Sequence, residues 1–152
     1  MIDYKLLKSL REKTGVSFSL CKRALEESDN DLVKAQKKLA QWGAKKAEEK
    51  STRPTFQGGI FVYVHHNKKI AALVELRTET DFVAVNREFQ QLGNEIAMQA
   101  ASLPAKSVPE LLKQEYIRDP EKSISDLIKE AIFKFGENIQ IARCVRWELG
   151  EK

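Results

Sequence analysis

The stretch Glu79-Thr80-Asp81-Phe82-Val83 joins two segments with different apolar patterns. Residues 70–76 before it predict a strand, and a helical pattern begins after it near Asn86. A junction between a strand and a helix lies on the surface, where contacts with partners concentrate. An acid beside a large aromatic residue at this place leaves two interpretations open, and the first is a segment that contacts a partner. In the alternative interpretation, the aromatic residue and the valine pack on the local core while the aspartate caps a short helical turn.

The residues before this stretch predict an antiparallel hairpin. Gly58-Gly59 opens a first strand, and His66-Asn67-Lys68-Lys69 forms the turn. The second strand extends from residue 70 to about residue 77 and directs three apolar side chains to one face: Ala72, Val74 and Leu76. His65 and His66 do not predict a metal site, because consecutive strand residues point to opposite faces and no acid or cysteine completes the ligands.

Three helices are predicted after the stretch. The first is capped by Asn86 and carries one apolar stripe: Phe89, Leu92, Ile96, Ala97 and Ala100. A short helix opens with the capping-box spacing of Ser107-Val108-Pro109-Glu110 and includes Tyr116. Asp119-Pro120 breaks that helix, and a longer one follows over about residues 124–135.

A last apolar alternation predicts a third strand. It places six side chains on one face: Ile139, Ile141, Arg143, Val145, Trp147 and Leu149. This strand can complete a three-stranded antiparallel sheet with the hairpin, and the helices can cover one side of that sheet. We therefore predict an α+β core for residues 57–152.

Residues 1–44 predict a bundle of three short helices. Each helix has one apolar face: Ile2, Leu6, Leu7 and Leu10 in the first, Phe18, Cys21, Ala24 and Leu25 in the second, and Leu32, Ala35, Leu39 and Trp42 in the third. Cys21 is interpreted as a small buried residue of this core. Residues 45–56 carry no apolar stripe and predict a linker that begins as a frayed helical extension.

Residues with strong local preferences set the expected ends of these helices. Gly15 can supply a left-handed stop for the first helix, and Ser17 can cap the second. Asp29 or Asn30 is expected to cap the third helix, and Gly43 is expected to end it.

Composition and motifs favour a binding protein over an enzyme. The chain has 152 residues, a formal net charge of +4 and 42% hydrophobic residues, as expected for a globular protein. Cys21 and Cys144 have no CxxC spacing and suggest neither a disulfide framework nor a zinc site. No apolar run approaches the roughly 18 residues of a membrane span. Nucleophile-elbow, P-loop and HExxH motifs are missing, so we expect no catalytic residue, metal or cofactor.

Several separated segments together resemble one family. They are Leu10-Arg11-Glu12-Lys13-Thr14-Gly15, Cys21-Lys22-Arg23-Ala24-Leu25-Glu26, Val74-Glu75-Leu76-Arg77-Thr78-Glu79-Thr80-Asp81-Phe82-Val83-Ala84, Phe135-Gly136-Glu137-Asn138-Ile139 and Arg146-Trp147-Glu148-Leu149-Gly150. In this order they resemble elongation factor Ts, the nucleotide exchange factor of elongation factor Tu. Arg77 and Thr78 stand where that family usually has Asn and Cys. The segment between the helix that begins at Asn86 and Ile124 is also far shorter than in most members, which carry a second core subdomain or a dimerisation insertion there.

The resemblance implies a fold, a partner and two contact sites. The fold is an N-terminal ubiquitin-associated-like bundle, a linker and an exchange-factor core. The partner is elongation factor Tu, with GDP or nucleotide-free. Thr80, Asp81, Phe82 and Val83 would displace its magnesium ion, and the segment Lys13-Thr14-Gly15-Val16 of the bundle would contact its nucleotide domain.

Further expectations concern location and assembly. The resemblance implies a cytoplasmic bacterial protein, or one of an organellar matrix or stroma if a transit peptide has been removed. No membrane and no direct nucleic acid contact is expected. Because the dimerisation insertion of some relatives is missing, a monomer is favoured over a homodimer joined edge to edge or face to face.

The alternative class is a basic RNA-binding module of the ribosome, which the positive charge suggests. Such a module needs aromatic residues among lysines and arginines on an exposed sheet face. Phe61, Tyr63 and Trp147 are the candidates, and we expect at least two of them to be buried.

Overall fold

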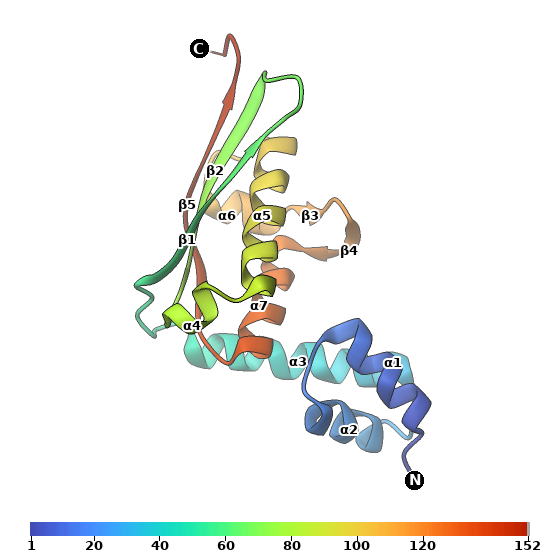
Figure 1. Cartoon of the computed structure of the whole chain (residues 1–152). Helices are drawn as coiled ribbons and strands as arrows, with labels where there is room; N and C mark the ends of the chain where they lie inside the picture. The colour runs from blue at the N-terminus through green and yellow to red at the C-terminus, as the bar shows by residue number, and fades with distance from the viewer. Residues whose placement is uncertain (152) are drawn as a thin grey trace. The chain divides into compact units, whose positions relative to one another are not determined.

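The computed structural model describes residues 1–151, which form two compact units. The first unit comprises Met1–Ser51 with Lys129–Gly136, and the second comprises Thr52–Ile128 with the residues from Glu137 onward. Helices dominate the first unit, whereas the second combines a three-stranded sheet with helices (Figure 1). The predicted α+β fold class is confirmed.

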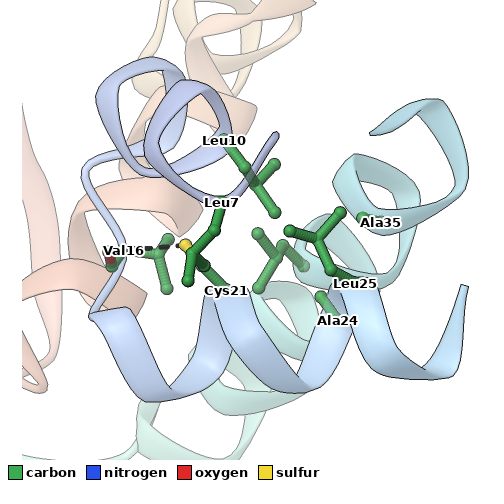
Figure 2. Packing of buried hydrophobic residues seen from close by; sticks show 8 residues of the cluster. Leu7, Leu10, Val16, Cys21, Ala24, Leu25 and Ala35 are labelled. Carbon is green, nitrogen blue, oxygen red and sulfur yellow. Dashed lines mark hydrogen bonds between the residues drawn. The ribbon is translucent and has the colours of Figure 1, made fainter. Parts of the chain in front are cut away.

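The first unit is built on three helices: α1 (Tyr4–Thr14), α2 (Phe18–Glu27) and α3 (Leu32–Lys50). Their apolar faces meet in one buried cluster, most of which Figure 2 shows from close by: Leu7, Leu10, Val16, Cys21, Ala24, Leu25, Ala35 and Leu39. The expected stripes therefore form this core, with Phe18 as an exception, because 46% of its surface is exposed. Leu32, Trp42 and Phe133 pack against the cluster from its margin.

Two predictions about α3 are wrong. Asp31 caps the helix by accepting from the Lys34 amide at 3.1 Å, whereas Asp29 and Asn30 adopt left-handed backbone angles in the preceding turn. Gly43 does not end the helix, which continues to Lys50 and includes the first part of the predicted linker. A Cβ atom at position 43 would lie 3.4 Å from the Phe133 side chain, an ordinary van der Waals distance, so Phe133 packs directly beside this part of the helix.

The second unit is organised around strand β2 (Ile70–Thr78). It lies between β1 (Gln57–Val64) and β5 (Ile139–Glu148), and both pairings are antiparallel (Figure 1). The short helix α4 (Asp81–Ala84) then leads to α5 (Arg87–Ser102), which packs against all three strands. The inner face of β2 is buried as predicted, at Ala72, Val74 and Leu76.

Close packing of α5 on β1 depends on Gly93. Phe61 of β1 lies edge-to-face with Phe89 of α5, with ring centroids 6.1 Å apart and planes inclined by 65°. A Cβ atom on Gly93 would lie 2.3 Å from the Phe61 ring, which is well inside contact distance. The glycine therefore allows the helix to lie directly on the aromatic side chain.

A bulge in β5 changes which residues share a face. Leu76 pairs with Ile141 and Glu75 pairs with Arg143, so Ala142 is an extra residue in the ladder. Because one residue is inserted, the alternation inverts after the bulge. The prediction that Val145 and Trp147 lie on the same face as Ile141 is therefore wrong.

The outer face of the sheet is exposed and mainly apolar as a result. Its exposed apolar side chains come from all three strands: Ile60, Val62, Val64, Leu73, Val145 and Trp147. Phe61 is buried and Tyr63 is half-buried, but 73% of the surface of Trp147 is exposed. The expectation that at least two of these three aromatic residues are buried is wrong. The arginines on the exposed face, Arg77 and Arg143, both form ion pairs with Glu75.

The segment between α5 and the last strand contains four elements. They are α6 (Val108–Lys113), β3 (Glu115–Tyr116), β4 (Asp119–Ser123) and α7 (Ile124–Phe135). The predicted helix through Tyr116 is wrong there, because β3 and β4 form a small antiparallel hairpin. Gln99 of α5 is fully buried and positions this hairpin, donating to the Glu115 carbonyl at 3.0 Å and accepting from the Ile117 amide at 3.0 Å.

Gly93→Ala tests the packing of α5 on the sheet. Alanine usually stabilises a helix interior by about 1 kcal/mol relative to glycine, but here its methyl group collides with the Phe61 ring. We expect a net loss of about 1–3 kcal/mol in the free energy of unfolding, measured by urea denaturation. The control is Asn94→Ala at the next, exposed position of the same helix. Equal stabilities of the two variants would contradict the close contact.

Candidate functional site

The corner after β2 is a single turn of helix with defined ends. Thr80 is its N-cap and accepts from the Val83 amide at 3.4 Å, so the alternative in which Asp81 caps the turn is wrong. At the other end, the Ala84 carbonyl accepts from the Gln90 side chain at 2.6 Å. The turn is thus fixed at both ends by side chains, and Ala84 is buried beneath it.

The turn presents its aromatic residue to solvent. Phe82 exposes 84% of its surface and Val85 exposes 76%. Asp81 is exposed beside them, whereas Val83 is half-buried. The alternative in which Phe82 packs on the core is wrong. An exposed acid next to exposed apolar side chains is an arrangement typical of a protein-binding surface.

A second exposed aromatic residue adjoins this corner. Phe56, with 85% of its surface exposed, directly precedes Gln57 of β1, and Gln57 pairs with Thr78 at the end of β2. Phe56 belongs to the predicted linker and is not among the predicted site residues. The available signal was an aromatic residue within an otherwise polar segment.

The carboxylate of Glu137 joins the corner to the start of β5. It accepts from the Thr78 hydroxyl at 2.9 Å, from the Thr80 amide at 3.0 Å and from the Thr80 hydroxyl at 2.6 Å. Burial alone would raise the pKa of Glu137, but the hydrogen bonds from Thr80 and Thr78 outweigh it and the pKa lies below its ordinary value. Glu137 is not among the predicted site residues, although it belongs to one of the segments that carry the family resemblance.

A second carboxylate makes the reciprocal connection. Glu79 accepts from the Asn138 amide at 2.7 Å, and its carboxylate lies 3.6 Å from the Arg53 guanidinium group. The Asn138 side chain donates to the Arg53 carbonyl at 2.8 Å. Three chain segments, separated by up to 85 positions, therefore meet at the base of the turn.

The N-terminal candidates are only partly accessible. Lys13 and Gly15 are exposed, and Gly15 ends α1 with a left-handed φ of 68° as predicted. Thr14 points inward, donates to the Leu10 carbonyl at 2.8 Å and lies 3.7 Å from the Cys21 sulfur. Val16, the fourth predicted residue, is buried, so it contributes to the core of the bundle rather than to its surface.

Cys21 is fully buried, as predicted, in the middle of the bundle. Its sulfur lies 3.5 Å from the Val16 carbonyl, the contact drawn as a dashed line in Figure 2. Burial raises the pKa of this thiol. The residue therefore serves packing, as a small apolar side chain.

The two histidines lie together in the turn after β1. Their ring centroids are 4.1 Å apart, and His65 accepts or donates a hydrogen bond of 3.0 Å with the Tyr63 hydroxyl. The expectation that they point to opposite faces is wrong, because neither residue belongs to the strand, which ends at Val64. Within residues 1–151 there is no group of three or more metal-binding side chains. No helix in that range is long and apolar enough to span a membrane.

Two family models match the chain. The model described as Elongation factor TS matches residues 79–152, a range that begins at the corner itself. The model described as the N-terminal region of mitochondrial elongation factor Ts matches residues 2–49, which include α1, α2 and nearly all of α3. Both functional candidates, in the bundle and at the corner, therefore lie inside matched ranges.

Three relatives illustrate how far the similarity extends. Elongation factor Ts of Thermosipho melanesiensis is 39% identical over 196 aligned positions, covering 99% of this chain and 100% of that protein. Elongation factor Ts of Coprothermobacter proteolyticus is 38% identical and covers 99% of each chain. The Clostridium botulinum protein is 41% identical over 96% of this chain, which spans only 48% of that relative. Since the first two alignments cover both chains almost completely, this chain belongs to the elongation factor Ts family.

Proposed function

We propose that this protein is the guanine nucleotide exchange factor of elongation factor Tu and promotes the release of GDP. Membership of the family supports this role. The single observation that carries it is the exposure of Phe82, of which 84% is open to solvent on a turn fixed at both ends. Exposed Val85 lies beside it, and a partner that covers this apolar pair would remove it from water.

The mechanism needs no covalent step. A carrier holds GDP tightly because a P-loop and a magnesium ion bind its phosphates. A protein that binds the nucleotide-free carrier more tightly than the loaded one must weaken nucleotide binding by the same factor. Phe82 would insert between helices of the carrier, while the Asp81 carboxylate would compete for the groups that order the magnesium ion.

The other two residues of the segment have supporting roles in this proposal. Thr80 caps the turn and donates its hydroxyl to Glu137. Val83 is half-buried and anchors the turn on the second unit. Only Asp81 and Phe82 would therefore reach into the carrier.

The bundle would supply a separate contact through the end of α1. Lys13 provides an exposed positive charge there, and Gly15 leaves its backbone accessible. Two contacts carried on one chain bind more tightly than either alone, because the second forms at a high effective concentration. Thr14 and Val16 would hold this segment in shape from inside the bundle.

A monomer that binds one carrier molecule remains the proposed assembly. The exposed outer face of the sheet is the observation that favours the alternative, a homodimer. Six apolar side chains are exposed there, which is more than isolated surface residues usually provide. A second copy placed face to face would cover them.

Phe82→Ala tests the proposed insertion of Phe82, with Asp81 beside it, between helices of the carrier; these two residues are called the wedge below. Because the side chain is exposed, the free energy of unfolding should change by less than about 0.5 kcal/mol. Stimulated GDP release should fall about 30-fold, which corresponds to roughly 2 kcal/mol for a central interface residue. A fluorescent GDP analogue loaded on elongation factor Tu measures the rate, and Ile117→Ala, another exposed apolar residue, is the control. Unchanged release by the Phe82 variant would exclude the wedge.

Lys13→Glu tests the contact of the bundle. The charge reversal should raise the Kd for the nucleotide-free carrier about tenfold at low salt, and the difference should shrink as salt screens the pair. Lys8→Glu changes the net charge equally at another exposed position of α1, away from the end of the helix that makes the proposed contact, so it should have a much smaller effect. Titration calorimetry measures the Kd of each variant for the nucleotide-free carrier. Equal Kd values for the two variants would place the contact elsewhere.

Light scattering after gel filtration tests the assembly. A monomer gives the mass of one chain, 17.4 kDa, and one added chain per carrier molecule in the complex. Val62→Lys places a charge on the outer face and should leave the mass of a monomer unchanged. A mass of two chains that this substitution reduces to one would instead establish the homodimer through the outer face.

A further inference from the structure

We infer that Glu137 is a positioning residue for nucleotide exchange: its carboxylate, together with that of Glu79, holds the Thr80–Val83 turn in the orientation that presents Asp81 and Phe82. This inference rests on the proposed function and deepens it. Neither glutamate needs to touch the carrier. They act through the backbone of the turn, which they fix to the sheet.

The hydrogen bonds at the base of the turn form a reciprocal pair. Glu137 accepts the Thr80 amide at 3.0 Å, and Glu79 accepts the Asn138 amide at 2.7 Å. Each of the two adjoining segments thus supplies one carboxylate and receives one amide from the other. Hydrogen bonds to a carboxylate are the stronger kind, and two opposed ones restrict both sliding and rotation.

The turn needs this support because its own interactions are few. A helix of four residues is far below the length that is stable alone. Phe82 itself gains little from packing, with 84% of its surface exposed. Its direction must therefore come from the residues at the base. A wedge that is already oriented loses less conformational entropy when it docks, and the gain appears as affinity.

Thr78 fits the same interpretation. It is fully buried and donates its hydroxyl to Glu137 at 2.9 Å. The side chain completes the set of donors around a carboxylate that would otherwise be poorly solvated there. Thr78→Val would remove this hydroxyl donor with little change in shape, whereas Thr78→Ser would keep it. The position therefore offers a matched pair of substitutions.

The test compares Glu137→Gln and Thr78→Val with Thr78→Ser and the exposed control Glu121→Gln. Amide hydrogen exchange of residues 80–83 in the free protein reports the orientation directly. GDP release from elongation factor Tu, titrated with each variant, separates the half-saturating concentration from the maximal rate. Circular dichroism melts confirm that each variant is folded, and Thr78→Val serves if Glu137→Gln does not fold.

A positioning role predicts a specific combination of results. The Thr80 amide should exchange at least tenfold faster in Glu137→Gln and Thr78→Val, and the half-saturating concentration should rise about tenfold. The maximal rate should change less than twofold, because the wedge itself is intact. Thr78→Ser and Glu121→Gln should behave like the unsubstituted protein.

Three results would overturn the inference. Unchanged protection of the Thr80 amide would mean that the carboxylate does not hold the turn. Faster amide exchange with an unchanged half-saturating concentration would reduce Glu137 to a role in stability alone. If the unsubstituted protein fails to accelerate GDP release, the proposed function itself is wrong, and the role assigned to Glu137 fails with it.

Discussion

Strand β2 is paired on both sides, and the position of every functional element in the second unit depends on that double pairing. From Ala71 to Thr78, each residue faces a partner on β1, and the same strand pairs with β5 down to Ile139. The central strand therefore ends at a fixed point in space. Because the turn with Phe82 begins two residues after this end, the sheet sets where the turn stands.

The residues around the turn divide the work between orientation and contact. The two glutamates at its base, Glu79 and Glu137, accept hydrogen bonds from backbone amides and threonine hydroxyls, whereas Asp81 is exposed. A carboxylate that already accepts several strong hydrogen bonds competes poorly for the groups of a partner protein. An exposed carboxylate can bind such groups. Acidic residues close together in the sequence thus have different chemical roles, which their hydrogen-bond partners determine.

Local chemistry allowed much of the fold to be predicted from the sequence. Ser17, Asn86 and Ser107 each cap the helix they were expected to cap, because a cap involves only residues two or three positions away. The alternation along β2 identified its buried face for a similar reason, since the side chains of a regular strand alternate with period two. The segment at residues 80–83 stood out by its position between a strand and a helix, but its role as a partner contact was predicted only through the family resemblance.

The sequence by itself therefore determined the main helices and strands, several of their caps and the resemblance to the family, while the tertiary structure decided the extent of α3, the β3–β4 hairpin and the faces of β5. The bulge at Ala142 reverses which side chains of β5 face the core in the residues that follow it. No local pattern shows the bulge, because it arises from pairing with β2. Gly43 lies inside α3 and beside Phe133, a residue ninety positions later in the chain. Likewise, the bond between Glu137 and Thr80 joins residues 57 positions apart. Such contacts depend on how the chain returns on itself, and only the folded arrangement brings those atoms together.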